Sequence, residues 1–331
     1  MTTDILPPGT ELFGYVIGRK IGKGGMGTVY LAKQKSLDRQ VALKVLHPHR
    51  LQHANAVENF LREARNAAKL NHENLVAIHA IHADTDRGVY CYSMEYVPGA
   101  SATKLVVDNG PLKRPLAMHL TYQVAQALGH AHRHDLVHRD VKPDNILVTE
   151  SGVAKLLDLG LVRDRMENLT EPGARLLTIV GTPEYSSPEQ SRNPAHAGPA
   201  SDVYSLGATL FFLLTGKVPF LGHTVIDTIV RAATEPVRYP DHIPADCRAL
   251  LDLMLAKRPT ARLRDGDAVV TALKDMAEGK PPSLHADLGA DDSTIVDAEP
   301  EDDDDDEESD DRKDDDGGAS RRRRVRRRRY H

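Results

Sequence analysis

The sequence predicts an α+β fold with two lobes, the first rich in strands and the second rich in helices. Residues 12–97 contain short runs of β-branched and aromatic residues that are separated by glycines or polar turns, as in an antiparallel sheet. Residues 98–280 instead carry apolar side chains at helical spacing. The length of 331 residues also suits two lobes, or one domain followed by a tail.

The first lobe is predicted to begin with strands at residues 15–17, 28–32 and 41–45. Residues 55–70 follow with apolar side chains on one helical face, which predicts a single amphipathic helix. Two more short strands are expected at residues 75–79 and 89–95. A sheet with one main helix therefore describes this lobe.

The character of the chain changes after Val97-Pro98-Gly99, where helices replace strands. They are predicted at residues 116–134, 202–215, 246–255 and 267–277. Gly216 follows the second of them directly and is suited to end it in a left-handed conformation.

Both ends of the chain are predicted to lie outside the fold. Residues 1–11 contain a Pro-Pro-Gly string and indicate a flexible start. Residues 281–331 lack apolar periodicity and carry a dense acidic block followed by eight arginines between Arg321 and Arg329. Such a segment cannot bury enough apolar surface to offset its ordering entropy, so we expect it to be disordered.

The composition excludes several classes of protein. The two cysteines, Cys91 and Cys247, cannot form a disulfide framework and lack the spacing of metal ligands, so no structural metal is expected. No apolar run approaches the roughly 20 residues that span a bilayer, and the first residues lack the basic start of a signal peptide. These features predict a cytoplasmic protein.

A glycine-rich string follows the first predicted strand. Glycines allow the backbone to approach phosphate oxygens closely and to offer N–H groups to them. The string alone would equally suit a plain hairpin turn. A dinucleotide site is disfavoured because the loop leads into strand-favouring residues rather than into a helix. The string reads Ile21, Gly22, Lys23, Gly24, Gly25, Met26, Gly27, Thr28, Val29.

Lys44 lies in the third predicted strand, in Val41-Ala42-Leu43-Lys44. On its own it would also fit a solvated strand edge, but with the glycine loop it is better interpreted as a phosphate-binding ammonium group. Such a cation needs a carboxylate partner. Glu63 is the first choice because its flanking residues fit the inner side of the predicted helix, and Glu58 is the competing candidate.

Residues 138–145 read His-Arg-Asp-Val-Lys-Pro-Asp-Asn and form the most specific string of the chain. Phosphoryl transfer needs a carboxylate beside the attacking hydroxyl, a cation near the phosphate and oxygen ligands for Mg²⁺. Asp140 and Lys142 suit the first two roles, and Asn145 offers an amide oxygen to the metal. Asp158, at the end of a predicted strand and before Leu159-Gly160, is suited to bridge the metal to the phosphates.

Together these strings resemble a eukaryotic-like, Hanks-type bacterial serine/threonine protein kinase over roughly residues 12–280. Within that family, Phe-x-x-Glu-Ala at residues 60–64 and Ser-Pro-Glu-Gln at residues 187–190 resemble the bacterial members. The resemblance implies a bilobal kinase fold with ATP and Mg²⁺ (or Mn²⁺) in the cleft between an N-lobe, residues 12–97, and a C-lobe, residues 98–280. It also implies a set of adenine contacts, namely Val29, Ala42 and Leu147 around the base, Met94 as gatekeeper, and a hinge from Glu95 to Val97.

The same resemblance implies substrate class and supporting contacts. Lysine two residues after Asp140 is the serine/threonine form, and Thr182 would bridge Asp140 and Lys142. Glu189 is expected to pair with Arg262. Asp202 is expected to hold the catalytic loop and to cap its own helix. Leu159 departs from the usual Phe, which bears on how the inactive state is held but not on metal binding.

Arg139 precedes the catalytic aspartate, and kinases of this form usually need an anion in the activation segment to neutralise it. We therefore predict activating autophosphorylation at Thr178 or Thr170, although threonines also simply suit a polar loop. In the tail, a phosphorylated Thr294 would resemble a ligand of forkhead-associated domains.

The arginine run has three open interpretations. It would bind polyanions such as nucleic acid, pair with the acidic block, or contact anionic lipid next to a membrane span if the chain is a fragment. Two alternatives to a protein-phosphorylating enzyme stay open at this stage. One is a pseudokinase scaffold, and the other is a polyanion-binding protein in which the kinase fold is secondary.

Overall fold

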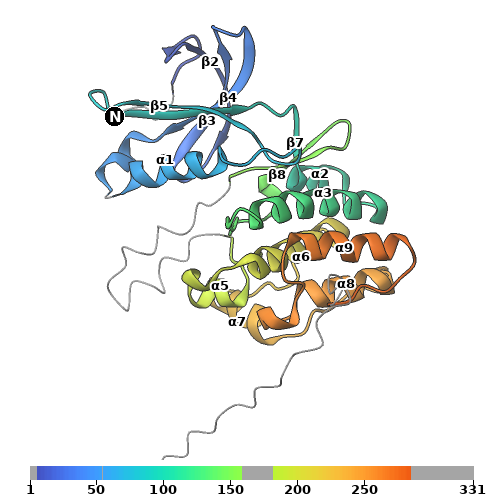
Figure 1. The fold of residues 1–331 in the computed structure, drawn as a ribbon. Helices are drawn as coiled ribbons and strands as arrows, with labels where there is room; N and C mark the ends of the chain where they lie inside the picture. Colours follow the sequence, from blue (N-terminus) through green and yellow to red (C-terminus); the bar gives the residue numbers. More distant parts are fainter. Residues whose placement is uncertain (1–5, 54, 159–181, 285–331) are drawn as a thin grey trace, which may run out of the picture. The chain divides into compact units, whose positions relative to one another are not determined.

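The computed structural model describes residues 6–53, 55–158 and 182–284, all of which belong to one compact unit. Its first part contains a six-stranded antiparallel sheet with the strand order β1-β2-β3-β4-β6-β5 (Figure 1). The strands are β1 (Glu11–Leu12), β2 (Tyr15–Lys23), β3 (Gly27–Gln34), β4 (Arg39–Leu46), β5 (Ile78–Asp84) and β6 (Val89–Glu95). This confirms the predicted strand-rich first lobe.

Helix α1 (Ala56–Ala67) packs on one face of this sheet, as the amphipathic pattern predicts (Figure 1). Phe60 and Ala64 are fully buried against Tyr92 and Met94 of β6. The short 3₁₀ helix η1 (Pro48–Gln52) connects β4 to α1. The helix is therefore fixed relative to the strands from which the cleft is built.

The strand predicted at residues 75–79 is displaced along the chain, because β5 begins only at Ile78. Leu75 instead forms a parallel bridge with Leu156, and Asn74 donates from its side chain to the carbonyl of Ala154 at 2.9 Å. The buried apolar residues that suggested a strand thus join the two parts of the fold.

The second part is helical and surrounds α6, which is buried along most of its length. The α-helices are α2 (Ala102–Asn109), α3 (Arg114–His132), α5 (Pro188–Arg192), α6 (Pro199–Thr215), α7 (Val225–Thr234), α8 (Ala245–Met254) and α9 (Gly266–Ala277). Gly216 has a φ of 70° and ends α6 as predicted. The four predicted helices are confirmed as α3, α6, α8 and α9, whereas α2, α5 and α7 were not predicted.

A small second sheet joins the helical part to the cleft. It consists of β7 (Gly99–Ser101), β8 (Ile146–Thr149) and β9 (Ala154–Leu156). Short 3₁₀ helices lie at η2 (Pro143–Asn145), η4 (Pro194–His196) and η5 (Pro259–Ala261). Because η2 runs directly into β8, the strand fixes the position of Asn145 at the end of the string of residues 138–145.

One sequence prediction about α6 is wrong. Asp202 does not cap this helix, because α6 begins three residues earlier at Pro199 with Gly198 as its N-cap. The proline is already suited to the first helical turn, so the helix starts there. Asp202 lies within the first turn and its carboxylate is used elsewhere.

Candidate active site

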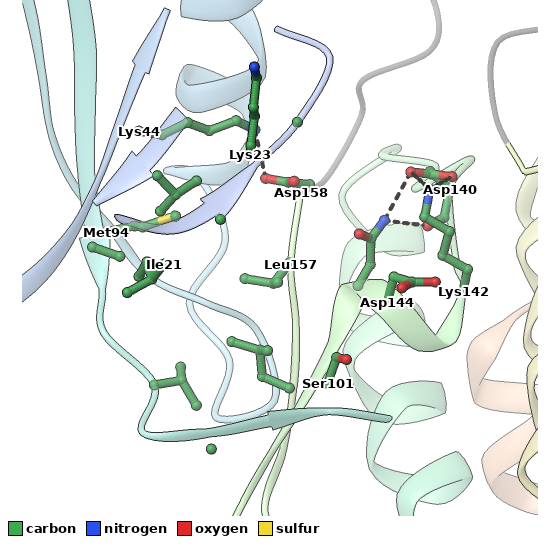
Figure 2. Close-up of a pocket in the computed structure, with 18 of the residues that line it drawn as sticks. Ile21, Lys23, Lys44, Met94, Ser101, Asp140, Lys142, Asp144, Leu157 and Asp158 are labelled. Carbon is green, nitrogen blue, oxygen red and sulfur yellow. Dashed lines mark hydrogen bonds and ion pairs between the residues drawn. The ribbon is translucent and has the colours of Figure 1, made fainter. Parts of the chain in front are cut away.

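A cleft of about 830 Å³ opens between the six-stranded sheet and the helical part. Figure 2 shows Ile21, Met94 and Leu157 to one side of Lys44 and Asp158, with Asp140 and Lys142 opposite. The following residues that the sequence assigned to nucleotide binding line this cleft: Ile21, Gly22, Lys23, Gly24, Gly25, Met26, Val29, Ala42, Lys44, Met94, Glu95, Val97 and Leu147. Apolar strand residues and polar loop residues therefore share one cavity, as a nucleotide site requires.

Gly27 and Thr28 are the two members of the glycine string that do not line the cleft. A methyl group at Gly27 would lie 2.4 Å from the carbonyl oxygen of Val45 on β4. Thr28 is buried, and its Oγ1 lies 2.9 Å from Nε2 of His47. The glycine at position 27 is therefore required for strand packing, a reason that the sequence pattern alone did not provide.

Lys44 is buried on β4 between two carboxylates. Its Nζ lies 2.9 Å from Oε1 of Glu63 and 2.9 Å from Oδ1 of Asp158. Glu63 also accepts a hydrogen bond from the hydroxyl of Tyr92 at 2.9 Å. Glu58, the competing candidate, is exposed. The ion pair thus forms with Glu63, whose position on the inner face of α1 follows from the helical period.

The buried cluster shifts the pKa values of its members. Burial by itself would lower the pKa of Lys44, but the charges of Asp158 and Glu63 outweigh it and raise that pKa well above its ordinary value. Burial raises the pKa of Glu63 to about 7 against the opposing pull of Lys44. Lys44 therefore keeps its charge at neutral pH, while Glu63 titrates there.

Asp140 is held by its neighbours in the catalytic loop. Nζ of Lys142 lies 2.9 Å and 2.8 Å from the two carboxylate oxygens of Asp140. The Asn145 side-chain amide donates to the Asp140 carbonyl at 2.8 Å and to its Oδ2 at 2.9 Å. Because the amide nitrogen of Asn145 is turned toward Asp140, its oxygen is left available as a ligand.

Asp202 fixes the backbone of this loop, as predicted. Its carboxylate accepts hydrogen bonds from the backbone N–H groups of His138 and Arg139, both at 2.7 Å. Nε2 of the buried His138 donates to the carbonyl of Leu157 at 2.7 Å, which ties the loop to the residue before Asp158. Arg139 has a φ of 66°, a strained left-handed conformation that these bonds stabilise.

The predicted pair of Glu189 and Arg262 is also present. The guanidinium group donates to both carboxylate oxygens, at 2.6 Å and 2.8 Å, and the Arg262 side chain is fully buried. Ser201 adds a third hydrogen bond to Glu189 at 2.6 Å. This pair lies outside the residues that line the cleft and joins α5 to the segment before α9.

Other expectations fall at the edge of the described residues or beyond them. Thr182 lines the cleft, and its bridge to Asp140 and Lys142 stays a prediction. Leu159, Thr170, Thr178, Thr294 and the arginine run lie outside the described residues.

Sequence reasoning missed several residues that line the cleft, namely Gly99, Ala100, Ser101, Lys104, Asp144 and Leu157. Leu157 directly precedes Asp158, so its position could have been inferred from the strand that carries the aspartate. Ser101 and Lys104 belong to the start of α2, where the side chain of Ser101 accepts a hydrogen bond from the backbone N–H of Lys104. Ser101 as N-cap is the signal that was overlooked.

A divalent metal is compatible with the donors present. Asp158 and Asn145 both line the cleft and offer hard oxygen atoms, which Mg²⁺ prefers. Among the described residues, no group of three or more His, Cys, Asp and Glu side chains is arranged to hold a metal ion. Two protein ligands therefore suit a metal whose other ligands come from phosphate and water.

A lysine–glutamate pair in a strand-rich lobe, facing an His-Arg-Asp loop of a helical lobe across one cleft, defines a protein kinase. The model of the protein kinase domain family matches residues 15–273, so this chain belongs to that family. Members of the family use ATP and a divalent metal ion. The bilobal fold and the family resemblance inferred from the sequence are thereby confirmed.

Bacterial serine/threonine-protein kinases are among the curated proteins to which the chain is similar. It is 35% identical over 283 residues to drp72 of Corynebacterium efficiens, which covers 83% of this chain and 54% of that protein. It is 35% identical over 298 residues to PknB of Mycolicibacterium smegmatis (87% and 47%), and 35% identical over 266 residues to PknA of Corynebacterium glutamicum (79% and 56%). The chain thus spans about half the length of these relatives.

Among the helices of the described residues, none combines the length and the apolar character that a membrane span requires.

Proposed function

We propose that this protein is a serine/threonine protein kinase that transfers the γ-phosphoryl group of ATP to hydroxyl groups of proteins. One observation carries the proposal: a single cleft holds Lys44, bound to Glu63, together with Asp158, Asp140 and Asn145. A pseudokinase scaffold would not need all of these groups. Each is present, and each has the partners that its role requires.

ATP binding is divided between apolar and polar parts of the cleft. Val29, Ala42 and Leu147 enclose the adenine, with Met94 behind it and the backbone of the hinge from Glu95 to Val97 beside it. The backbone N–H groups of the glycine loop and the ammonium group of Lys44 bind the phosphates. We place the boundary between the two lobes at residue 97, just after β6 ends.

Mg²⁺ (or Mn²⁺) would be held by Asp158 and by the side-chain oxygen of Asn145. When bound, it neutralises the charge of the phosphate oxygens. Lys44 supports this arrangement because its hydrogen bond orients the Asp158 carboxylate.

Asp140 accepts a hydrogen bond from the substrate hydroxyl group and orients that group toward the γ-phosphorus. Lys142, which is hydrogen-bonded to Asp140, adds positive charge where the transferring phosphoryl group develops negative charge. Both residues are partly exposed, so a protein substrate can reach them.

The test is transfer of labelled γ-phosphate to a peptide library with Ser, Thr and Tyr acceptors. We expect label on Ser and Thr, its loss on chelation of divalent metal, and its loss in Asp140→Asn. Equal labelling by wild type and Asp140→Asn would refute the proposed role of Asp140. Label on Tyr alone would refute the substrate class.

Activation by autophosphorylation of Thr178 or Thr170 is a second part of the proposal. It is supported by Arg139, whose backbone is fixed between Asp202 and Gln190 beside the catalytic aspartate. Phosphate on either threonine would offer a charge-assisted partner to this guanidinium group. Mass spectrometry of the active protein tests this, and full activity with both threonines unmodified would exclude it.

The tail supports proposals of its own. Phosphorylated Thr294 would bind a forkhead-associated domain, and the run from Arg321 to Arg329 would bind nucleic acid or anionic lipid. Binding assays with the phosphorylated tail peptide, and with a truncation at residue 318, test these two ideas. We place the kinase domain in the cytoplasm, with membrane association if a span adjoins this segment.

A further inference from the structure

The linker between β4 and α1, residues 47–53, contacts the glycine loop at three points. The backbone N–H of His47 donates to the carbonyl of Met26 at 2.9 Å. Nε2 of His47 lies 2.9 Å from Oγ1 of Thr28. Nε of Arg50 donates to the carbonyl of Gly25 at 2.9 Å. Two consecutive carbonyl groups of the loop are therefore bound by the linker.

These bonds fix the direction of the loop's amide groups. The C=O and N–H of a trans peptide unit point in opposite directions. Binding of the Gly25 carbonyl thus directs the N–H of Met26 away from the linker, and binding of the Met26 carbonyl does the same for the N–H of Gly27. None of residues 47–53 lines the cleft, whereas Gly22 to Met26 do. The N–H of Met26 therefore faces away from the linker at a residue that lines the cleft, whereas Gly27 does not line it.

The loop needs such a restraint because its sequence provides little of its own. Gly24 and Gly25 have wide backbone freedom, and around a methyl group built at Gly24 the nearest atom is 3.8 Å away. The Met26 carbonyl is held by the backbone N–H of His47, but the carbonyl of the preceding peptide is bound by the Arg50 side chain alone among the described contacts. An unrestrained loop would have to lose this freedom when it binds phosphate, which would weaken binding.

We propose that Arg50 is a positioning residue that holds the Gly25–Met26 peptide in its phosphate-binding orientation. The inference rests on the proposed ATP-binding function. Arg50 is not a catalytic residue in this account, since it acts through the backbone of the loop. Its bond lies at the protein surface, so its loss affects phosphate binding more than folding.

The test compares ADP with adenosine, which lacks phosphate, by calorimetric titration of the full chain. For Arg50→Met we expect ADP to bind about fivefold to tenfold more weakly, the range of one hydrogen bond, and adenosine to bind as it does to wild type. Arg50→Lys, which retains a cationic donor, restores part of the ADP affinity. Arg65→Met is the matched control, because Arg65 is an exposed arginine on α1 without a contact to the loop.

ADP titrations at high salt distinguish a positioning role of Arg50 from a general attraction between its charge and the phosphates. At about 1 M salt the Debye length is about 3 Å, so a general charge effect would vanish while the loss caused by a disordered loop persists. Unchanged ADP affinity in Arg50→Met, equal losses for ADP and adenosine, or an equal loss in Arg65→Met would each overturn the inference. Failure of wild type to bind ADP would instead overturn the proposed function and the inference with it.

Discussion

At the scale of single residues, the cleft is organised around one buried cation with two carboxylate partners. Lys44 contacts both Glu63 and Asp158, and these three groups come from β4, from α1 and from the residues that directly follow β9. A buried ion pair contributes little net stability, because desolvation offsets the attraction. Its value here lies in orientation, since it holds a cation and a candidate metal ligand at fixed positions.

The pKa of Glu63 predicts opposite trends of activity and stability with pH. Burial raises this pKa to about 7, so acidification from pH 8 to 6 protonates Glu63 and weakens its hold on Lys44. We expect kcat/KM for ATP to fall over this range. A group whose pKa is raised on folding contributes stability below its unfolded pKa and loses it as the pH rises through the folded value. The Glu63 contribution to the free energy of unfolding therefore increases on acidification.

The measurement is a pair of pH profiles, one of kcat/KM and one of denaturant unfolding, for wild type and Glu63→Gln. Glutamine cannot titrate, so the variant loses the acid limb near pH 7 and keeps lower activity throughout. An acid limb that is identical in both proteins would assign the titration to another group.

At the scale of elements, close backbone packing decides which glycines tolerate a side chain. Gly27→Ala places a methyl group 2.4 Å from the Val45 carbonyl, which forces β3 away from β4. We expect a loss of about 1–3 kcal/mol in the free energy of unfolding, typical of overpacking. Gly24→Ala is the matched control, since its nearest neighbour is 3.8 Å away. Equal unfolding midpoints for the two variants would contradict this account.

The joint between α5 and the segment before α9 depends on the buried guanidinium group of Arg262. Arg262→Met leaves the Glu189 carboxylate without its charged partner, and removing one partner of a buried pair typically costs about 3–5 kcal/mol. Lys35→Met breaks an exposed pair with Glu11 and should change stability by less than about 1 kcal/mol. Denaturant unfolding of both variants checks this contrast, and a small effect at Arg262 would show that the joint is not required for stability.

At the scale of the whole molecule, local strings predicted which residues line the cleft better than they predicted the connections between elements. The spacing around Asp140 was sufficient to predict that Asp140 and Asn145 lie in the same cleft as Lys44. The periodicity of α1 was sufficient to select Glu63 over Glu58 as the partner of Lys44. Neither signal depends on long-range packing.

The structural roles that could not be predicted from the sequence depend on contacts between distant segments of the chain. Leu75 and Val76 have the composition of a strand, yet they lie in the joint to β9. Asp202 resembles a helix cap in the sequence, but α6 begins earlier, at Pro199. The carboxylate of Asp202 is therefore free to bind the backbone of residues 138–139. The sequence does not predict the contact of Arg50, because its partner is the backbone carbonyl of Gly25 in the loop between β2 and β3.

The link between the lobes also emerges only from the fold. Nζ of Lys155 on β9 lies 2.8 Å from Oε1 of Glu95, the residue that ends β6 at the hinge. Leu75 and Asn74 add backbone and side-chain contacts to β9. The two lobes are thus joined at Glu95 and at residues 74–75, both of which contact β9.

The central claim is that this cleft transfers phosphate with Asp140 orienting the acceptor. The most direct test is a single-turnover measurement on Asp140→Asn, with ATP affinity measured on the same protein and the exposed Asp241→Asn as control. We predict that transfer falls by about 10²- to 10⁴-fold, the usual contribution of a positioned acid–base group, while ATP affinity changes by less than about threefold. Transfer at the wild-type rate, or a loss explained entirely by weaker ATP binding, would contradict the claim.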